Sequence, residues 1–540
     1  MARAHPALHF AVALLLVLVA LPMVATLLAA VAGDLSTLAH LWDTVLPRYL
    51  SVTAMLVATV CIGTALVGTV TAWLVSAYDF PGRRIVEVAL VLPLAFPAYV
   101  LAYAYTDLLD HPGAVQTALR SATGWGPRDY WFPEIRSTGG AAFVLIVVLY
   151  PYVYLLARAA FVHQGGSTFL AARGLGLGPI AAFRQVSLPA ARPAIAAGTL
   201  LVGMETLADF GTVSYFGVQT FATGIYQSWF SLADRAGAAQ LALGLLAMTL
   251  LLTLLERRTR HSGRFSTERA GEPVPPPRLR GIRGGAALFV CASPVLLGAI
   301  VPGAHLAAMA GGAQQSLFSE RYLGFLTNSL TLACIASALT VAAAIALGYF
   351  RRLSPTPARR RAVDLGRLGY AVPGTVIAVG LLVPFAALDN ALDAVMRAQF
   401  GLSTGLLVTG TIWLLVAAYV IRFLAAAIGA FETGEIRVTP NIDAAARSLG
   451  RGPFDTLWRV HLPLMAPGLL SGALIVFVEV MKELPATLIM RPFNFDTLAV
   501  QAHRLAADER LNGAAVPSLA IAAVGVLPVV LLMARMRRGR

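Results

Sequence analysis

Long apolar runs separated by short polar segments follow one another along almost the whole chain. The runs are about 20 residues long and lack strict alternation, so they suit helices that cross a bilayer rather than barrel strands. They lie near residues 7–32, 50–77, 85–109, 141–163, 192–211, 236–256, 285–311, 326–350, 366–388, 403–431, 467–490 and 513–534. This pattern predicts an all-α integral membrane protein with about twelve transmembrane helices in two six-helix halves.

A segment of different composition separates the two halves. Residues 257–284 contain Pro275, Pro276 and Pro277 among many arginines, and they include no apolar run. Proline-rich, charged sequence favours an extended connector. We therefore expect a first half at residues 1–256, a cytoplasmic linker at residues 257–284 and a second half at residues 285–540.

Composition supports the membrane class and changes the meaning of the charge. The chain is 58% hydrophobic and 13% charged, whereas a soluble protein carries roughly 25% charged residues. A formal net charge of +14 could indicate nucleic-acid binding in a soluble protein. Here most arginines fall in alternate loops, and the positive-inside rule places these loops and both termini in the cytoplasm. We therefore expect membrane lipid around the chain and no nucleic-acid partner.

One polar stretch occurs twice. Each position of the first copy and its match in the second are the same number of residues apart, as Gly176 and Gly450 are. We call residues 170–198 the first repeat loop and residues 444–472 the second repeat loop. A polar stretch that is repeated without a gap between apolar helices indicates two equivalent docking surfaces for a two-fold partner. The positions that define the repeat are Ala171, Ala172, Arg173, Gly176, Leu188 and Pro189, and Ala445, Ala446, Arg447, Gly450, Leu462 and Pro463.

The repeat extends beyond these loops. The pairs Phe96-Pro97 and Val372-Pro373 stand at nearly the same separation as the loops, so the whole six-helix half is duplicated. Both halves have the same orientation, which predicts a pseudo-two-fold axis along the membrane normal.

The apolar run that follows each repeat loop carries acidic residues. Glu205 matches Glu479 and Asp209 matches Glu483 in the alignment of the two loops, and Lys482 is the only lysine of the chain. A spacing of four residues predicts that each pair lies on one helix face. Ionisable groups within a span normally face a bundle interior or an aqueous path. These five residues are therefore candidates for a cation path or gate, with an ion-pair network between helices as the alternative.

Several kinds of chemistry have no support in the sequence. There is no Gly-x-x-x-x-Gly-Lys-Ser/Thr phosphate loop, so the chain cannot hydrolyse ATP alone. No Cys/His cluster has metal-ligand spacing, and whether a metal binds is left open. His163 and His461 are expected to be ordinary surface residues. We expect a transport subunit rather than an enzyme.

The spacing in the two repeat loops resembles the coupling loops of permeases of binding-protein-dependent ABC importers. The resemblance implies a type I ABC importer permease-like fold and loops that seat in a groove of an ATPase dimer in the cytoplasm. It also implies that ATP and Mg²⁺ bind to that partner and that this chain binds no cofactor. The family usually has Glu at the first position of the motif, where this chain has Leu170 and Ala444. An acidic contact to the ATPase is then absent or moved to Asp443.

The acidic segments resemble those of fused ferric-iron importer permeases, which carry both halves on one chain. The matching stretches are Glu-Thr-Leu-Ala-Asp-Phe-Gly-Thr from Glu205 and Lys-Glu-Leu-Pro-Ala-Thr-Leu from Lys482, followed by Arg491-Pro492-Phe493. This resemblance implies ferric-iron import, a periplasmic substrate-binding protein and the bacterial inner membrane. The alternatives are a fused permease for thiamine, a polyamine or a phosphonate, and a secondary carrier that needs no ATPase.

Overall fold

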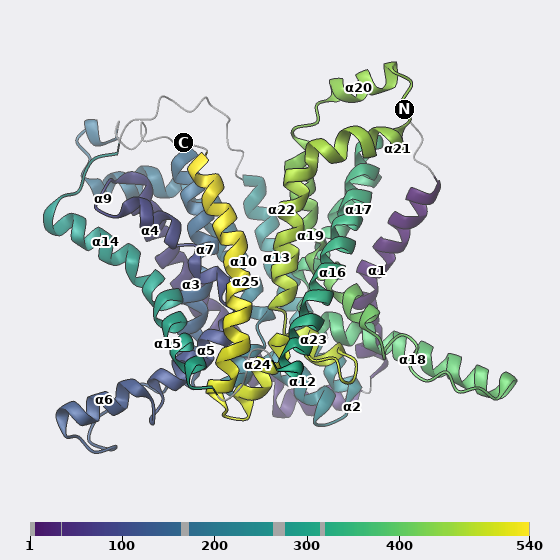
Figure 1. Ribbon diagram of the computed structural model, residues 1–540, viewed down its shortest axis with the longest axis horizontal. Helices are drawn as coiled ribbons and strands as arrows, with labels where there is room; N and C mark the ends of the chain where they lie inside the picture. Colours follow the sequence, from purple (N-terminus) through teal and green to yellow (C-terminus); the bar gives the residue numbers. More distant parts are fainter. Residues whose placement is uncertain (1–5, 34, 164–171, 263–275, 314–318, 539–540) are drawn as a thin grey trace. The chain divides into compact units, whose positions relative to one another are not determined.

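The computed structural model of the chain describes residues 6–33, 35–163, 172–262, 276–313 and 319–538 (Figure 1). Every regular element in these ranges is a helix, which confirms the all-α fold class. Eleven of the described helices are long and apolar enough to cross a membrane, or twelve if one bent pair is a single span. The number agrees with the prediction of about twelve.

The predicted span at 85–109 is this bent pair. Its two parts, Arg83–Ala95 and Ala98–Thr123, meet at an angle of 94°. The backbone is extended at the Phe96-Pro97 step, because proline lacks an amide hydrogen and keeps the preceding residue out of the helical region. The equivalent step in the second half, Val372-Pro373, is extended in the same way.

One compact unit comprises residues 1–46, 224–247 and 316–501, and we call it the α19 unit. Its centre is formed by α16, α19 and α22, which pack on one another, while α1 packs on α18. Gly380 makes that close approach possible, since a side chain there would collide with the backbone of Pro22. The helices of the unit are α1 (Pro6–Ala32), α2 (Leu35–Thr44), α16 (Glu320–Leu353), α17 (Pro357–Gly366), η4 (Arg367–Ala371), α18 (Gly374–Phe400), α19 (Ile412–Glu435), α20 (Pro440–Ser448), α21 (Pro453–Thr456), η5 (Leu457–His461), α22 (Leu462–Met481) and α23 (Pro485–Met490).

The other compact unit comprises residues 47–223, 248–315 and 502–540, and we call it the α7 unit. Here α7 packs on α10, and α15 and α25 pack on each other and on α5. Its helices are α3 (Leu46–Ala77), α4 (Arg83–Ala89), η1 (Leu92–Ala95), α5 (Ala98–Leu109), α6 (Ala114–Thr123), α7 (Thr138–His163), α9 (Pro179–Ala182), η2 (Phe183–Ser187), α10 (Leu188–Ala208), α11 (Gly211–Tyr215), α14 (Gly281–Val295), η3 (Leu296–Ile300), α15 (Val301–Gly311) and α25 (Leu511–Arg538). Three further helices, α12 (Phe221–Phe230), α13 (Arg235–Ser262) and α24 (Leu498–Ala507), are divided between the units.

The two units do not coincide with the two halves of the sequence. The α19 unit includes α1 and α2 from the first half, and the α7 unit includes α14, α15 and α25 from the second half. The division of the sequence into two halves at residues 257–284 thus remains a prediction. Helices from both sides of this division pack together within each unit.

The predicted linker is partly helical. Its first residues continue α13 to Ser262, and α14 begins at Gly281. Between them, Pro277 accepts a backbone hydrogen bond from Asp79 at 3.0 Å, and Leu279 donates one to Asp79 at 2.7 Å. The extended connector predicted for the whole linker is therefore wrong at both ends, and residues 263–275 lie outside the described part.

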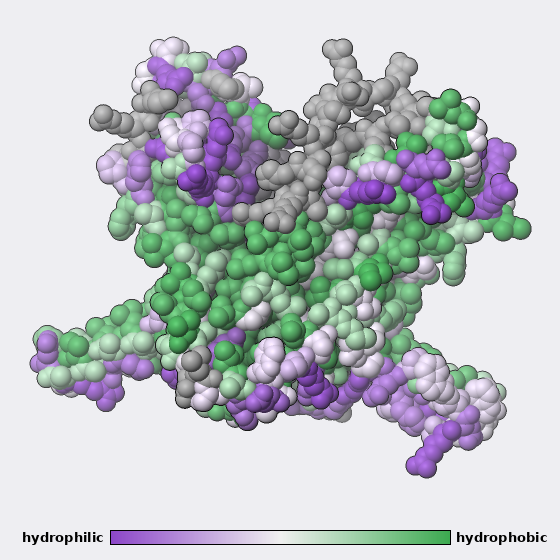
Figure 2. Space-filling view, turned by 180° about the vertical axis from the view of Figure 1, so that it is seen from behind, coloured by the Kyte–Doolittle hydropathy of each residue, from purple (hydrophilic) through white to green (hydrophobic). Residues whose placement is uncertain are grey.

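The long helices expose apolar side chains. Phe10, Val17 and Val31 of α1 are 71%, 63% and 71% exposed. On the face drawn in Figure 2, hydrophobic residues cover the long helices and hydrophilic residues gather near their ends. Such a surface would be unfavourable in water, but it suits lipid hydrocarbon. The chain is therefore a multi-pass membrane protein.

Candidate functional site

The second repeat loop is a helix, a turn and two short helical segments. The helix α20 ends at Ser448, the short helix α21 begins at Pro453, and η5 leads into the long helix α22. The first repeat loop repeats this order in α9, η2 and α10. Its described part begins at Ala172, so Ala171 lies outside it.

The turn in both loops is a Schellman motif. The amide of Gly450 donates to Arg447 at 2.9 Å, and that of Arg451 donates to Ala446 at 3.0 Å. The first loop makes the same two bonds between equivalent residues, from Gly176 and Leu177. The φ angles of Gly176 and Gly450 are 90° and 74°, which only glycine adopts without strain. The two turns therefore have the same backbone conformation.

The Leu-Pro steps have a structural role that the sequence did not reveal. Leu188 and Leu462 donate their amides five residues back, to Phe183 and Leu457, so each loop enters its long helix through one π turn. The next residue, Pro189 or Pro463, has no amide hydrogen and cannot restore α-helical bonding at this point. The motif therefore fixes how each loop joins its spanning helix.

Each loop also presents exposed apolar side chains. Leu175 and Leu449, at equivalent positions of the two turns, are 87% and 79% exposed. Ile180 and its equivalent Phe454 are exposed as well. Sequence reasoning did not single out these residues, although apolar side chains at matching places in two polar loops were a usable signal. They give each loop an apolar contact surface.

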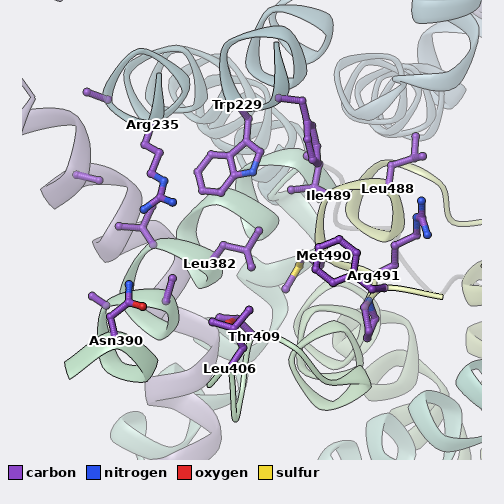
Figure 3. Close-up of a pocket in the computed structure, with 18 of the residues that line it drawn as sticks. Trp229, Arg235, Leu382, Asn390, Leu406, Thr409, Leu488, Ile489, Met490 and Arg491 are labelled. Atoms are coloured by element: carbon purple, nitrogen blue, oxygen red, sulfur yellow. The ribbon is translucent and has the colours of Figure 1, made fainter. Parts of the chain in front are cut away.

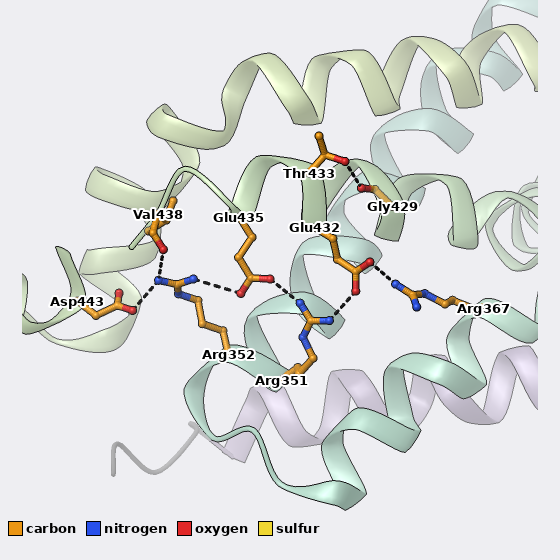
Figure 4. Close-up of polar contacts among 9 residues, drawn as sticks. All are labelled: Arg351, Arg352, Arg367, Gly429, Glu432, Thr433, Glu435, Val438 and Asp443. Atoms are coloured by element: carbon orange, nitrogen blue, oxygen red, sulfur yellow. Dashed lines mark hydrogen bonds and ion pairs between the residues drawn. The ribbon is translucent and has the colours of Figure 1, made fainter. Parts of the chain in front are cut away.

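Ion pairs hold the second repeat loop against the ends of α16 and α19. Figure 4 shows Arg352 reaching Asp443, Glu435 and the carbonyl of Val438, at 2.6, 3.2 and 2.9 Å. His461 also bonds to Asp443, at 2.6 Å. The carboxylate of Asp443 is therefore bonded to residues of this chain, which disfavours the predicted acidic contact between Asp443 and the ATPase. His461 is buried, so its prediction as a surface residue is wrong.

The same network continues along α19. Arg351 pairs with Glu432 at 2.5 Å and also pairs with Glu435, while Arg367 of η4 pairs with Glu432 (Figure 4). These groups lie at helix ends that come from distant parts of the sequence. The network therefore joins α16, α19, α20 and η4 into one support for the loop.

Aromatic packing supports the first repeat loop instead. The ring of Phe183 lies 4.4 Å from that of Trp73 and 6.3 Å from that of Phe161. An ion pair between Arg158 and Glu87 lies in the same unit. Arg158 occupies the position of Glu432 in the repeat, so the sign of the charge on the central helix is reversed.

The acidic residues Asp209 and Glu483 lie at breaks between helices. Helix α10 ends at Ala208 and α22 ends at Met481. The prediction that each i, i+4 pair lies on one helix face is therefore wrong, because the helix ends before the second acid.

These two carboxylates cap the short helices that follow the breaks. Glu483 accepts bonds from the amides of Ala486 and Thr487, at 3.0 and 3.1 Å, and from the Thr487 hydroxyl at 2.7 Å. Asp209 accepts equivalent bonds in the α7 unit, from the Val213 amide at 3.2 Å and the Thr212 hydroxyl at 3.0 Å. A carboxylate at a helix N-terminus is stabilised by amide donors and by the helix dipole.

The remaining acids stay within their helices. Glu479 forms an ion pair with Lys482 at 2.8 Å, and Glu205 is half-buried on α10. Among the described residues, no group of three or more His, Cys, Asp or Glu is arranged to hold a metal ion. The geometry supports a polar break at the end of each long helix, and assignment of these residues to a path or gate remains a prediction.

One protein family matches two segments of the chain. The family described as binding-protein-dependent transport system inner membrane component matches residues 64–261 and 358–539. The chain is 27% identical to the Fe(3+)-transport system permease protein FbpB 2 of Haemophilus influenzae, over 97% of this chain and 98% of that protein. It is 28% identical to the probable ABC transporter permease protein y4fN of Sinorhizobium fredii, over 93% and 88%.

A shorter relative matches only part of the chain. The putative 2-aminoethylphosphonate transport system permease protein PhnV of Salmonella typhimurium is 27% identical over 43% of this chain and 76% of that protein. The family match covers more than half of the chain, with one copy in each half of the sequence. The chain therefore belongs to the family of binding-protein-dependent transport system inner membrane components.

Proposed function

We propose that this permease carries ferric iron across the bacterial inner membrane, driven by ATP hydrolysis on a separate subunit. One observation carries the choice of substrate. Similarity to a permease named for Fe(3+) transport extends over nearly the full length of both chains. The arginine distribution supports a topology with both termini and both repeat loops in the cytoplasm.

The partner in the cytoplasm would be an ATPase dimer, with one subunit on each repeat loop. The loops offer the same backbone turn and the same exposed leucine, Leu175 or Leu449. Burying one leucine side chain contributes about 1.5–3 kcal/mol, so these residues are the contacts we expect to dominate. ATP and Mg²⁺ would bind to the dimer, and this chain would bind no cofactor.

The long helices α10 and α22 would transmit movement of the loops. Each begins within a repeat loop, and the two helices contain 21 and 20 residues. At a rise of about 1.5 Å per residue, each is a rod of about 30 Å. Each rod ends at a break whose next helix is capped by Asp209 or Glu483. A displacement of the loop would therefore move the capped break, and alternating access would follow from coupled movement at both breaks.

We propose that Glu205, Asp209, Glu479, Lys482 and Glu483 form the gate at these breaks. A gate needs charged groups that hold one geometry until a helix moves. Asp209 and Glu483 meet this need because their oxygens are bonded to the following helix. A periplasmic binding protein would deliver the iron and supply most of the affinity.

The experiment is ATP-dependent uptake of radioactive iron into vesicles that contain this chain, its ATPase and the iron-loaded binding protein. We expect uptake that requires all three proteins and is not reduced by excess thiamine, polyamine or phosphonate. Uptake without the ATPase would indicate a secondary carrier. Uptake of one of the competing compounds instead of iron would show that this compound, and not iron, is the substrate.

A phosphonate is the second candidate substrate. It is favoured by the partial similarity to PhnV, whose name refers to 2-aminoethylphosphonate. The same vesicles, loaded with a binding protein for phosphonate, would test it. Iron remains the first choice because the similarity to PhnV covers less than half of this chain.

A further inference from the structure

A cavity of about 840 Å³ lies within the α19 unit. Its walls come from the end of α1, from α12 and the start of α13, from α18 and from α23 with the segment that follows (Figure 3). Apolar side chains, including Trp229, Leu382 and Met490, form most of the lining. Two arginines, Arg235 and Arg491, line it as well, and none of the described lining residues is acidic. The cavity is therefore apolar with a positive charge.

Two polar side chains on one side of this cavity have no polar partner among the described residues. The described residues provide no hydrogen bond or ion pair to the side chain of Arg235 or to that of Asn390. Figure 3 shows both on the same side of the cavity, with the guanidinium of Arg235 directed toward the side where Asn390 lies. Arg491 pairs with Asp496, but its Nε has no hydrogen-bond partner among the described residues. Hydrogen-bond donors at the cavity wall thus lack acceptors among the described residues.

The equivalent region of the α7 unit has a different character. A cavity of about 340 Å³ there is lined by two acids, Asp107 and Glu509, beside the single arginine Arg510. Arg235 of the larger cavity is the first residue of α13, whereas the first residue of α25, the last helix of the second half, is the apolar Leu511. The positive charge is therefore not a general property of this position in the repeat.

We propose that the cavity of the α19 unit binds a phosphate group through Arg235 and Asn390. A guanidinium binds phosphate oxygens through short, charge-assisted hydrogen bonds, and an amide can add a further donor. A metal cation is disfavoured, because the described lining offers positive charge and no carboxylate. The phosphate can belong to a phospholipid headgroup, whose acyl chains suit the apolar walls, or it can be free inorganic phosphate.

The test measures binding to the purified full-length chain, in the absence of ATPase, binding protein and iron. One arm titrates phosphatidylglycerol and diacylglycerol with the same acyl chains, followed by native mass spectrometry. The other arm titrates inorganic phosphate against chloride at equal ionic strength, followed by calorimetry. Preference for phosphatidylglycerol assigns a lipid headgroup, and saturable binding of inorganic phosphate assigns the free ion. Because transport is not measured, failure of the iron proposal would leave this result unchanged.

Variants decide whether the site is the one described. Arg235→Gln should weaken binding about tenfold or more, since a charge-assisted hydrogen bond is lost. Asn390→Leu should weaken it several-fold, by roughly the worth of one neutral hydrogen bond. Arg321→Gln is the matched control, because Arg321 is an exposed arginine of the same unit that does not line the cavity. The proposal is overturned if neither titrant binds saturably, or if Arg235→Gln and Asn390→Leu both bind like the control.

Discussion

The second repeat loop rests on ion pairs, whereas the first rests on aromatic rings. Both have the same Schellman turn and the same π entry into a long helix. Under the second loop, Arg352 and His461 converge on Asp443. Under the first, Phe183 packs between Trp73 and Phe161. The two loops therefore share the backbone of the turn and of the helix entry, while the side chains that support them differ in chemistry.

Removing Arg352 should produce the largest difference between the loops. Arg352→Gln leaves Asp443 and Glu435 without their shared cation, and breaking a buried pair costs about 3–5 kcal/mol. We expect about 2–3 kcal/mol here, since the side chains of Arg352 and Asp443 are 14% and 29% exposed. Hydrogen exchange of residues 440–463 should accelerate, and the first repeat loop should be unaffected. Arg451→Gln, in the exposed pair with Asp455, is the control, and equal acceleration in both variants would refute a supporting network.

Removing Phe183 should destabilise only the first repeat loop. Deleting a fully buried phenylalanine ring costs about 3–5 kcal/mol, and we expect about 2 kcal/mol because Phe183 is half-buried. Hydrogen exchange of residues 172–189 should accelerate by the same factor at low and high salt, since no charge is lost. Phe454→Ala, which removes an exposed ring of the second loop, should leave exchange unchanged. A strong salt dependence would argue against aromatic support.

The turn glycines should behave alike in the two loops, because both have the same backbone conformation. Valine at Gly176 or Gly450 must adopt a positive φ, at a cost of about 1–2 kcal/mol. We expect similar losses of ATPase affinity in Gly176→Val and Gly450→Val, with normal membrane insertion. Gly174→Val is the control, because Gly174 has no positive φ and no atom close to its Cβ position. Full ATPase affinity in the double variant Gly176→Val, Gly450→Val would remove the argument for these turns.

The smallest effect on stability should arise at a turn where one half has the acidic residue Glu509 and the other half has Ala233. Glu509 and its equivalent Ala233 both have a positive φ, at 57° and 51°. Arg136 donates to both oxygens of Glu509, at 2.7 and 2.9 Å, and these bonds lower the pKa of Glu509. A lowered carboxyl pKa gives stability that is present above the ordinary value and is lost as the pH falls through the lowered value.

The contact between Arg136 and Glu509 should therefore open on acidification below about pH 4.5. The pair is largely exposed, so we expect a change of at most about 1 kcal/mol. Hydrogen exchange of residues 508–511 measured against pH should show it, and Glu509→Gln should remove the pH dependence. Asp234, next to Ala233, accepts a bond from the Gly237 amide at 2.9 Å, so that turn has a carboxylate of its own and is not the control. An unchanged transition in Glu509→Gln would contradict the assignment to Glu509.

Sequence alone predicted the parts of the fold that depend on local pattern. Apolar runs of bilayer length predicted the spans, and the constant separation between matching positions predicted two equivalent loops. The breaks at Asp209 and Glu483 were missed because both acids continue an apolar run. The Leu484-Pro485 step was the available signal, since proline lacks the amide hydrogen that a continuing helix needs and favours the first position of a new one.

Features that depend on distant contacts could not be predicted in this way. Arg352, Asp443 and His461 lie far apart in the sequence, so no local pattern indicated that His461 is buried. Likewise, hydropathy did not show that α1 packs with helices of the second half. Such packing depends on the complementary shapes of distant residues, such as Gly380 against the backbone of Pro22. A single sequence does not indicate which distant residues fit together.

We propose that this chain imports ferric iron and that its two repeat loops dock on an ATPase. The most direct measurement is ATP-dependent iron uptake into vesicles by the wild type and by the double variant Leu175→Asp, Leu449→Asp. We predict uptake by the wild type that requires ATPase and iron-loaded binding protein, and its loss in the variant, with ATPase affinity reduced by at least about tenfold. Equal uptake by both would contradict docking through these loops, and absence of iron uptake by the wild type, with its ATPase bound and active, would contradict the substrate.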